Sequence, residues 1–458
     1  MKKILFVVAT NAASEIENRY MPLGLMYLSA SLKRHFGESM FQIKMISSDF
    51  EKTFFDYKPD LVGISSVSQN YGLAKKYARL SRQSGVPAIL GGVHISIMPQ
   101  SLSEDFVLGC IGEGENTIIE IMKVFLDLDG SFPTSRLSAI KGIIFWHNGT
   151  LEYSEPGWTE KELDNIPHPD RSLEGPVKHG YIFSSRGCPY RCSFCSSSRY
   201  WQNLRYFSAE YVVEEIEELV NAYGTRMISF YDDLFVGNTN RLKKIADLVV
   251  ARGLNRTVQF TCSARANTIV QDVIEQLKRM NVVSVGMGLE SGNPRVLHYL
   301  KGRSVTVEDN FKAVELLHSA GIMANASFVI GSPDETKDEM LDTYNFIRRS
   351  KLSFVDIYVL TPYPGTPIWE YALSKGFVSN EMDWGRLNVN FEVSGKNAII
   401  LSEKLDRYEL IKMYKKFRRI RLIRNTLSLW NHPMKIDFIK VSTGMLKEKL
   451  SKWLARVF

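Results

Sequence analysis

The densest chemistry in the chain is a group of three cysteines at residues 186–198, in the stretch RGCPYRCSFCSSS. Cys188, Cys192 and Cys195 form the pattern C-x3-C-x2-C, and Gly187 before the first of them suits a tight loop. Three thiolates at this spacing suit an iron–sulfur cluster. Because a [4Fe-4S] cluster usually takes four cysteines, one iron would keep an open position for a small ligand.

Zinc is the alternative metal for a group of cysteines. A structural zinc site takes four ligands, usually from two pairs of closely spaced residues, and the sequence has no second pair. The remaining cysteines, Cys110 and Cys262, stand alone, and each is interpreted as a small buried hydrophobe. Five cysteines in 458 residues do not indicate a disulfide framework either. An iron–sulfur centre in a reducing compartment is therefore favoured.

Alternating strands and helices surround the cysteine loop. Between residues 176 and 375 the apolar pattern predicts six strands with helices between them. The strands are expected at 181–185, 227–235, 258–265, 283–292, 325–332 and 354–367. This alternation predicts a parallel sheet with right-handed crossovers, here a partial (β/α)6 barrel of the TIM type. The cysteines follow the first strand, at the carboxyl face where such barrels hold their sites.

A second α/β unit is predicted before the barrel, at residues 1–130. The strand KKILFVVAT, the helix PLGLMYLSASLKRHF and the segments after them alternate in the same way, which predicts a doubly wound, Rossmann-like parallel sheet. Small, glycine-rich loops follow three of its strands, at 63–70, 91–96 and 111–116. One glycine after a strand makes only a turn, but three such loops at one edge predict a ligand crevice.

The two units are joined by a segment of different composition at residues 131–175. It contains a predicted hairpin, AIKGIIFWHNGTLEYSE, and the proline-containing stretch IPHPDRSLEGP, and it is interpreted as a linker. The chain is thus divided into a sheet unit at 1–130, a hairpin and linker at 131–175, a barrel at 176–375 and a basic helical region at 376–458.

The cysteine loop carries a family resemblance. The pattern C-x3-C-x-aromatic-C, with Phe194 before the last cysteine, resembles the cluster motif of the radical S-adenosylmethionine (radical SAM) enzymes. The resemblance implies a [4Fe-4S] cluster on Cys188, Cys192 and Cys195 whose open iron binds the amino and carboxylate groups of S-adenosylmethionine. An electron from an external donor would release a 5′-deoxyadenosyl radical, which takes a hydrogen atom from the substrate.

Later segments resemble the S-adenosylmethionine contacts of the same family and are carried over by position. FYDDLF resembles the second-strand motif at the methionyl end, CSARAN the third-strand motif at the carboxylate and ribose, and GLESG the fourth-strand ribose contacts. FVIGSPDET resembles the adenine shelf, where Val329 and Ile330 offer backbone and Gly331 permits close approach, and LTPYPGTP resembles the closing turn. The expected S-adenosylmethionine-binding residues are Phe194, Asp232, Asp233, Ser263, Arg265, Glu290, Ser291, Ile330 and Gly331.

Three of these residues also have an ordinary structural interpretation. Asp233 is placed to cap the start of a helix. Arg265 has the geometry for a two-pronged grip on a carboxylate but also for a surface ion pair. Glu290 lies within an otherwise apolar strand, where a carboxylate is costly unless it has a partner, so a functional role is favoured there.

The N-terminal unit resembles the cobalamin-binding domain that precedes many radical SAM barrels, through PLGLMYLSASL, PDLVGISS, GGVHISIMP and IGEGE. Proteins that ligate cobalt with a histidine carry D-x-H-x-x-G, and none of the eight histidines here has an aspartate two residues before it. The resemblance therefore implies a cobalamin without histidine on its lower face, approached there by the loop at 65–71, with His94 at the corrin periphery or a neighbouring backbone group. The expected cobalamin-binding residues are Ser65, Ser66, Val67, Ser68, Gln69, Gly91, Gly92, His94, Gly112, Glu113 and Gly114.

Together the two resemblances imply methylation of an unactivated carbon. The radical would activate a substrate carbon, which takes a methyl group from methylcobalamin, and a second S-adenosylmethionine would restore that group. A radical SAM oxidoreductase or cyclase is the main alternative, since some relatives keep the N-terminal domain without methyl transfer. A methylthiotransferase needs further cluster cysteines, and only Cys110 is available. A non-catalytic cobalamin or redox sensor would not need the DDLF, SAR and LESG segments.

The net charge of +7 is concentrated in the last part of the chain. Residues 401–458 hold 15 basic and 5 acidic residues, which leaves 42 and 45 for the rest. Bulk charge therefore predicts no nucleic-acid partner. Residues 404–430 predict a basic helix with apolar residues at helical period, namely Leu410, Met413, Phe417, Ile420, Ile423 and Leu427. Such a helix either packs on the barrel or lies on an anionic membrane surface, and the second arrangement would favour a lipid over another small-molecule substrate.

The expected location is the cytoplasm, with the membrane surface as an extension of it. The first residues turn polar after a short apolar run, which does not resemble an export signal. No window offers the roughly 20 apolar residues that a membrane-spanning helix needs.

Overall fold

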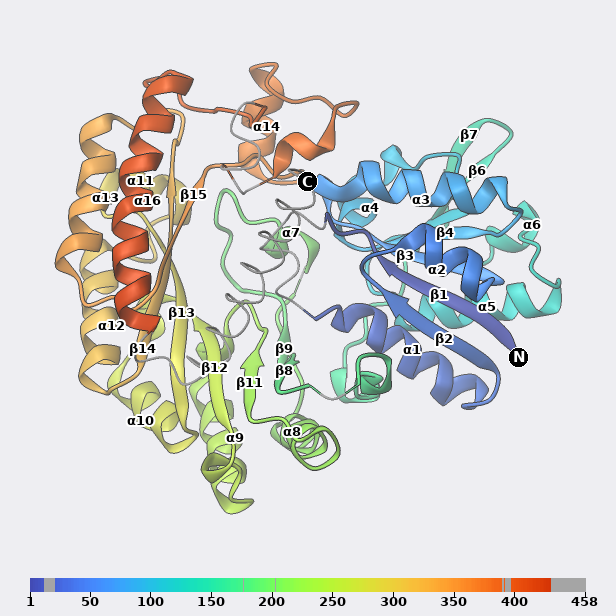
Figure 1. The fold of residues 1–458 in the computed structure, drawn as a ribbon, viewed down its shortest axis with the longest axis horizontal. Helices are drawn as coiled ribbons and strands as arrows, with labels where there is room; N and C mark the ends of the chain where they lie inside the picture. The colour runs from blue at the N-terminus through green and yellow to red at the C-terminus, as the bar shows by residue number, and fades with distance from the viewer. Residues whose placement is uncertain (12–20, 176, 202, 389–390, 392–396, 430–458) are drawn as a thin grey trace, which may run out of the picture.

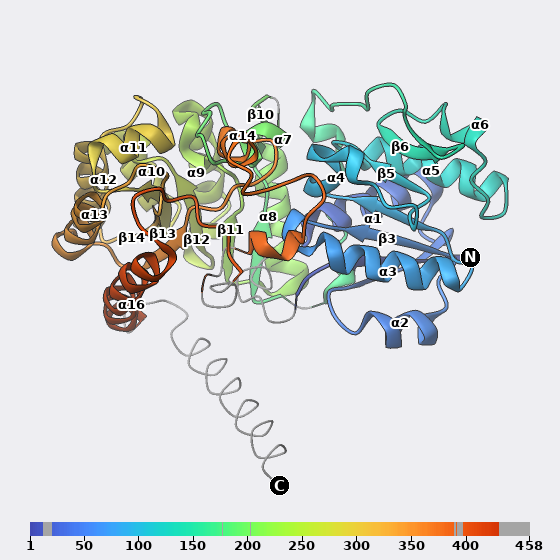
Figure 2. The same cartoon turned by 90° about the horizontal axis from the view of Figure 1, so that it is seen from above.

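A computed structural model describes residues 1–11, 21–175, 177–201, 203–388, 391 and 397–429. The chain folds around two sheets that lie side by side, the first built from the N-terminal third and the second from the middle of the chain (Figures 1 and 2). Both predicted α/β units are therefore present, and the fold class is confirmed.

The N-terminal sheet has seven strands in the order β2-β1-β3-β4-β5-β6-β7. The strands are β1 (Lys2–Val8), β2 (Phe41–Ile46), β3 (Leu61–Ser65), β4 (Ala88–Gly91), β5 (Leu108–Cys110), β6 (Ile143–His147) and β7 (Thr150–Tyr153). The first five run parallel, and β6 and β7 are antiparallel to their neighbours. The chain order reverses between β1 and β3, and open α/β sheets bind ligands at such a point.

Helices cover both faces of this sheet, which explains why its central strand is apolar throughout. Leu5 and Val7 of β1 pack against α2 and α3, whereas Ile4 and Phe6 pack against α1 and α5. The helices of this unit are α1 (Leu23–Phe36), α2 (Phe50–Tyr57), α3 (Tyr71–Gln83), α4 (Val93–Ile97), α5 (Glu115–Asp127) and α6 (Thr134–Leu137).

The predicted hairpin forms, but its role differs from that of a linker. Strands β6 and β7 extend the N-terminal sheet, with β6 antiparallel to β5. Ile143, Ile144 and Phe145 are buried, so the hairpin adds to the core of this unit. The connection to the barrel is consequently shorter than residues 131–175, because apolar residues in β6 find partners on β5 that local sequence does not show. The remaining boundaries predicted from the sequence, such as the end of the barrel at residue 375, stay predictions.

The second sheet contains the six predicted strands, all parallel, in the order β15-β14-β13-β12-β11-β8. They are β8 (His179–Ile182), β11 (Met227–Phe230), β12 (Gln259–Ala264), β13 (Val282–Glu290), β14 (Met323–Ile330) and β15 (Val355–Val359). Within the described residues β8 and β15 do not pair with each other, so the barrel is partial. A short antiparallel pair, β9 (Ser185–Arg186) and β10 (Arg205–Tyr206), brackets the cysteine loop.

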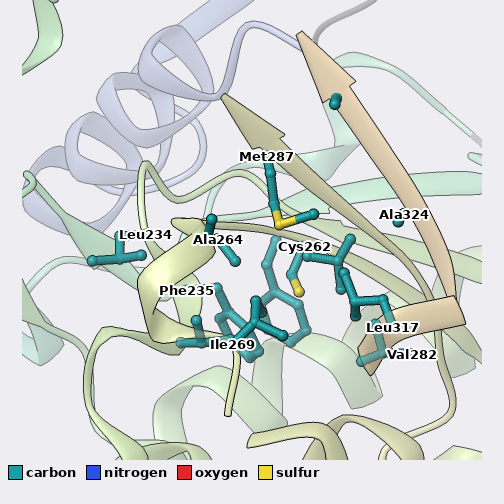
Figure 3. Packing of buried hydrophobic residues seen from close by; sticks show 14 of the residues in the cluster. Leu234, Phe235, Cys262, Ala264, Ile269, Val282, Met287, Leu317 and Ala324 are labelled. Carbon is teal, nitrogen blue, oxygen red and sulfur yellow. The ribbon is translucent and has the colours of Figure 1, made fainter. Parts of the chain in front are cut away.

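Helices pack on the outer face of the barrel sheet. They are α8 (Ala209–Tyr223), α9 (Thr239–Ala251), α10 (Gln271–Arg279), α11 (Pro294–Lys301), α12 (Val307–Ser319) and α13 (Lys337–Arg349), and α7 (Ser197–Tyr200) follows the cysteine loop. Two of them begin with complete capping boxes, Thr306 with Asp309 and Thr336 with Glu339. Figure 3 shows Cys262 within the hydrophobic core beneath these helices, together with Phe235, Met287 and Leu317. The interpretation of Cys262 as a buried hydrophobe agrees with this position.

The C-terminal part runs along the barrel. Helix α14 (Pro367–Ser374) leads to α16 (Arg407–Leu429), which packs beside β15 and α13 (Figure 1). Of the six apolar residues predicted on one face of this helix, Leu410, Met413, Phe417 and Ile420 are buried, whereas Ile423 and Leu427 are 61% and 70% exposed. No helix among the described residues is both long and apolar enough to cross a bilayer.

Candidate functional site

The cysteine loop lies between β9 and α7 at the carboxyl end of β8. Gly187 opens it with a φ of +96°, and a Cβ there would lie 2.6 Å from the backbone oxygen of Asn203, so only glycine fits. Ser193 ties the loop to the barrel: its N–H donates to Leu300 O (2.9 Å) and its carbonyl accepts from the Ile368 N–H (3.3 Å). These bonds hold the loop between α11 and α14.

The three thiols on this loop are half-buried, and none forms a disulfide. Burial, with a further contribution from the negative charge of Asp233, raises the pKa of Cys188 to about 11 and also raises the pKa of Cys195. Iron binding would displace these protons, because a metal takes the thiolate. In the described part of the chain no three side chains of the metal-binding types converge on a single ion. A cluster is compatible with this spacing, since its irons take separate thiolates.

The two aspartates after β11 have different surroundings. Asp232 is buried and accepts hydrogen bonds from the Ser184 and Ser185 N–H groups (2.8 Å each) and from the Ser184 hydroxyl. Its carboxylate is therefore used to fix the strand end that precedes the cysteine loop. Asp233 is exposed and accepts from Ser197 Oγ at 2.6 Å. It does not cap a helix, because α9 is capped by Asn238, so the capping alternative is wrong.

Arg265 follows β12 and lies directly against the cysteine loop. Its Nη1 donates to Cys192 Sγ at 3.4 Å, and its Nη2 donates to Ser304 Oγ at 2.8 Å and Lys301 O at 3.1 Å. The guanidinium stacks over Tyr190 at 4.0 Å, so its plane is fixed. Its Nε–H is buried without a partner, which leaves one donor for a bound ligand. Ser263, two residues earlier, is half-buried on the strand face opposite the Cys262 side chain.

Glu290 ends β13 in a strained conformation. Its φ is +61°, in the left-handed region, and the pairing with β14 shifts register between Gly288 and Glu290. A bulge of this kind re-aims a side chain, and strain in a non-glycine residue is typical of functional sites. Burial raises the pKa of Glu290, although Lys301 lies 3.9 Å away. Ser291 is fully buried instead, with its hydroxyl bonded to Thr343 and to the Asn293 N–H.

The predicted adenine shelf is built from the end of β14. The side chain of Ile330 is buried in the core of the barrel, and that of Val329 packs on the core that includes the N-terminal unit. A ligand could therefore contact only the backbone of these two residues. Gly331 has a φ of +84°, and its N–H and that of Ser332 both donate to Glu335 Oε2, at 2.8 and 3.0 Å. Phe194 also packs against the core shared with the N-terminal unit. Both segments lie where the two sheets meet.

A cavity of about 280 Å³ opens at the carboxyl ends of β1, β3 and β4. Eight of the eleven predicted cobalamin residues line it, from all three glycine-rich loops: Ser65, Ser66, Val67, Gly91, Gly92, Gly112, Glu113 and Gly114. Its deeper wall is apolar and includes Phe6, Leu25 and Ile118. Gly92 has a φ of +96°, and a Cβ there would lie 2.8 Å from Ser66 O, so this glycine holds two of the loops in close contact.

His94 does not line this cavity. It is fully buried, with its ring nitrogens bonded to Ser68 Oγ (3.0 Å) and Ser101 Oγ (2.9 Å) and its ring packed against Tyr71 and Trp384. Burial lowers its pKa to about 3, so the ring is neutral. The expected corrin contact of His94 and Ser68 is therefore not supported by their position, because the loop residues fold back onto the protein. Gln69 is half-buried and also lies outside the cavity lining.

Part of the cavity wall comes from the barrel. Phe183, Arg186, Tyr200 and Trp201, from the segment that carries the cysteines, line the same cavity. Arg186 forms ion pairs with Glu113 (3.0 Å) and Glu115 (2.5 Å). Burial alone would lower the pKa of Arg186, but the two carboxylates outweigh it, so the pKa is raised. Arg186 is not among the site residues predicted from the sequence. Its place directly before Gly187 and the cysteine motif was the signal that could have indicated it.

The residues fit the cofactors that the two resemblances imply. Three thiols on one loop suit a cluster with an open iron, the unpartnered Nε–H of Arg265 suits a carboxylate, and the glycine-lined cavity with an apolar interior suits a large, largely apolar cofactor.

Comparison with known proteins supports the same assignment. The family model of the radical SAM superfamily matches residues 182–347, and that of the B12 binding domain matches residues 10–122. An uncharacterized methyltransferase of Pyrococcus horikoshii is 30% identical over 84% of this chain and 85% of its own length. The anaerobic magnesium-protoporphyrin IX monomethyl ester cyclase of Cereibacter sphaeroides is 25% identical over 86% of this chain and 67% of its own length.

A solved structure shares the fold. The radical S-adenosylmethionine methyltransferase TsrM from Kitasatospora setae, with cobalamin and a [4Fe-4S] cluster bound, superposes with a TM-score of 0.68 at 18% identity, covering 82% of this chain and 75% of that one. From the two family models, the cofactors of the protein are a [4Fe-4S] cluster, S-adenosylmethionine and cobalamin. The chain belongs to the radical SAM superfamily, among the members that carry a B12-binding domain.

Proposed function

We propose that the protein is a cobalamin-dependent radical SAM methyltransferase that adds a methyl group to an unactivated carbon of a small molecule. One observation carries this proposal: the cavity at the switch point of the N-terminal sheet shares a wall with the segment that bears the three cysteines. A substrate bound between the cavity and the cysteine loop would be accessible both to a methyl donor in the cavity and to a radical source on the loop. The P. horikoshii relative, which is called an uncharacterized methyltransferase, supports methyl transfer.

The residues have separate tasks in this proposal. Cys188, Cys192 and Cys195 hold the cluster. The free Nε–H of Arg265 and the hydroxyl of Ser263 bind the carboxylate and ribose of S-adenosylmethionine, and Glu290, aimed inward by its bulge, accepts from the ribose hydroxyls. When bound, the cluster with S-adenosylmethionine supplies a radical that removes hydrogen, and cobalamin supplies the methyl group.

Three of the predicted contacts, Asp232, Ser291 and Phe194, take a different role in the proposal. Asp232 and Ser291 have their oxygens engaged within the protein, so they position the strand ends. Phe194 and Ile330 pack in hydrophobic cores, so only the backbone of Ile330 is assigned to the adenine. Asp233, exposed beside the thiols, is the acidic residue assigned to the methionyl end.

The test needs no knowledge of the substrate. The chain is reconstituted anaerobically with iron, sulfide and hydroxocobalamin, reduced with dithionite, and given S-adenosylmethionine labelled in its methyl group. We expect the label on the corrinoid and 5′-deoxyadenosine in solution, and loss of the deoxyadenosine in Cys188→Ala but not in Cys110→Ala. Deoxyadenosine without any labelled corrinoid would contradict methyl transfer and favour an oxidoreductase or cyclase. Absence of both products with intact cofactors would favour a sensor.

The proposed partners are a small-molecule substrate and an external electron donor, without nucleic acid. The first 400 residues have no excess of basic groups, which supports the last point.

We further propose peripheral contact with anionic membranes through the end of α16. Leu422, Ile423 and Leu427 are each more than 60% exposed there, and no acidic residue follows Glu409 in this helix. Co-sedimentation with vesicles containing anionic lipid at low salt tests it. Binding should weaken in Ile423→Ser combined with Leu427→Ser, whereas equal binding of wild type to neutral and anionic vesicles, or none to either, would contradict it.

A further inference from the structure

A buried network of two arginines and two glutamates joins the N-terminal unit to the barrel. Arg186 pairs with both Glu113 and Glu115, and Arg205 pairs with Glu113 as well. The side chains of the four residues are between 5% and 14% exposed. We call these residues the interdomain network.

The network is balanced in charge and holds Arg186 firmly. Removing one member of a buried ion pair leaves an uncompensated charge, so its members depend on one another. The rings of Tyr27, from the N-terminal unit, and Trp201, from the barrel, each lie 5.4 Å from the Arg186 guanidinium. Arg186 is therefore fixed by groups from both units at once.

The network connects the two cofactor sites through the backbone. On one side, Glu113 and Glu115 flank Gly114 in the third glycine-rich loop of the cavity. On the other, Arg186 is separated from Cys188 only by Gly187, where the contact with Asn203 O leaves no room for a side chain. Tyr200, at the far end of the cysteine loop, donates its hydroxyl to Gly112 O at 2.9 Å. Both ends of the cysteine loop thus contact the same loop of the cavity.

We infer that Arg186 couples the two cofactors, so that corrinoid binding and cluster assembly each strengthen the other. Binding of either cofactor orders the segment from Arg186 to Trp201, so the second cofactor to bind loses less conformational entropy. Linkage makes the effect reciprocal, and typical couplings change affinity by about fivefold to 150-fold. The inference rests on the proposed function in taking the cavity as the corrinoid site and the three cysteines as the ligands of the cluster. Arg186 acts as a positioning residue.

The experiment measures the affinity of hydroxocobalamin for the full chain, anaerobically, with and without a reconstituted cluster. In wild type the loaded chain should bind at least about fivefold more tightly. In Arg186→Gln this ratio should fall toward one, whereas the control Arg279→Gln, which breaks an exposed pair with Asp247, should keep it. A purely structural role of Arg186 would weaken both affinities and leave the ratio intact.

A second readout uses the cluster. Bound corrinoid should slow the loss of iron to a chelator in wild type but not in Arg186→Gln. If Arg186→Gln does not fold, the wild-type ratio and Tyr200→Phe, which loses the hydroxyl that donates to Gly112 O, decide the matter: Tyr200→Phe should lower the ratio. Equal affinities with and without cluster in wild type would overturn this inference alone. Absence of corrinoid binding in both states would overturn the proposed function together with it.

Discussion

Replacing Glu335 with glutamine should remove a pH-dependent loss of stability at the end of β14. Glu335 is fully buried, its Oε2 accepts the N–H groups of Gly331 and Ser332, and its Oε1 has no partner. Burial, which outweighs the two backbone hydrogen bonds, raises its pKa to about 7. Glutamine keeps an oxygen for both N–H groups but cannot ionise, so the substitution isolates the effect of charge.

The sign and size follow from linkage. Because the folded pKa is raised above the ordinary value of 4.5, the stabilising contribution is complete below about pH 4.5 and is lost as pH rises through about 7. At about 1.36 kcal/mol per pH unit, the loss by pH 8 is about 3 kcal/mol. The free energies of unfolding of wild type and Glu335→Gln should be similar at pH 5, and the variant should be the more stable one at pH 8.

Urea unfolding of the cluster-free chain, followed by circular dichroism at several pH values between 5 and 8, measures this difference. Glu155→Gln is the matched control: a hydrogen bond from Lys141 holds the pKa of Glu155 below its usual value of 4.5, so Glu155 stays ionised between pH 5 and 8. The control should differ from wild type by a constant amount over the same range. A constant difference for Glu335→Gln as well would refute the reasoning, because it would mean that Glu335 is ionised throughout.

Three further predictions concern the cofactor sites. Cys188→Ala should abolish the visible absorption of the reconstituted cluster and leave hydroxocobalamin bound, only more weakly. Cys110→Ala should keep the cluster. A cluster in the Cys188→Ala variant would contradict the ligand assignment. Gly92→Ala should weaken hydroxocobalamin binding tenfold or more, about 1.4 kcal/mol, because its Cβ would meet the Ser66 backbone. Gly112→Ala, with open space around the new Cβ, should weaken binding less. Equal losses of affinity would show that the close loop contact is unimportant. Asp232→Ala should destabilise the fold by about 1–3 kcal/mol and speed iron loss to a chelator, because it leaves two buried N–H groups without an acceptor. Unchanged melting temperature and iron retention would argue against its positioning role.

Local sequence patterns predicted most of the fold. The six barrel strands and the first four strands of the N-terminal sheet were predicted, because a strand buried on both faces is apolar throughout and its neighbours are helices at a 3.6-residue period. The hairpin was also recognised. Its membership in the N-terminal sheet was not, because Ile143–Phe145 meet β5, whose residues lie more than thirty positions earlier.

The sites divide in the same way. The sequence alone could indicate the three cysteines and the glycines of the cavity loops. Their residue types and spacing are directly related to metal binding and to tight turns. The use of Asp232 could not be predicted, because its partner Ser184 is 48 residues away. The burial of His94 depends on Trp384, almost 300 residues later in the chain. The contacts that decide these roles are made between segments that local patterns treat separately.

The sequence by itself determined the two α/β units, the cluster motif and the glycine-rich loops, because residue type, period and turn geometry act over short distances. Only the tertiary structure decided that Arg186 bridges the units, that Glu290 ends its strand with a positive φ, and that α16 buries its first half while exposing Ile423 and Leu427. Burial and charge pairing depend on which distant groups fill the surrounding space, and that is fixed when the sheets and helices pack.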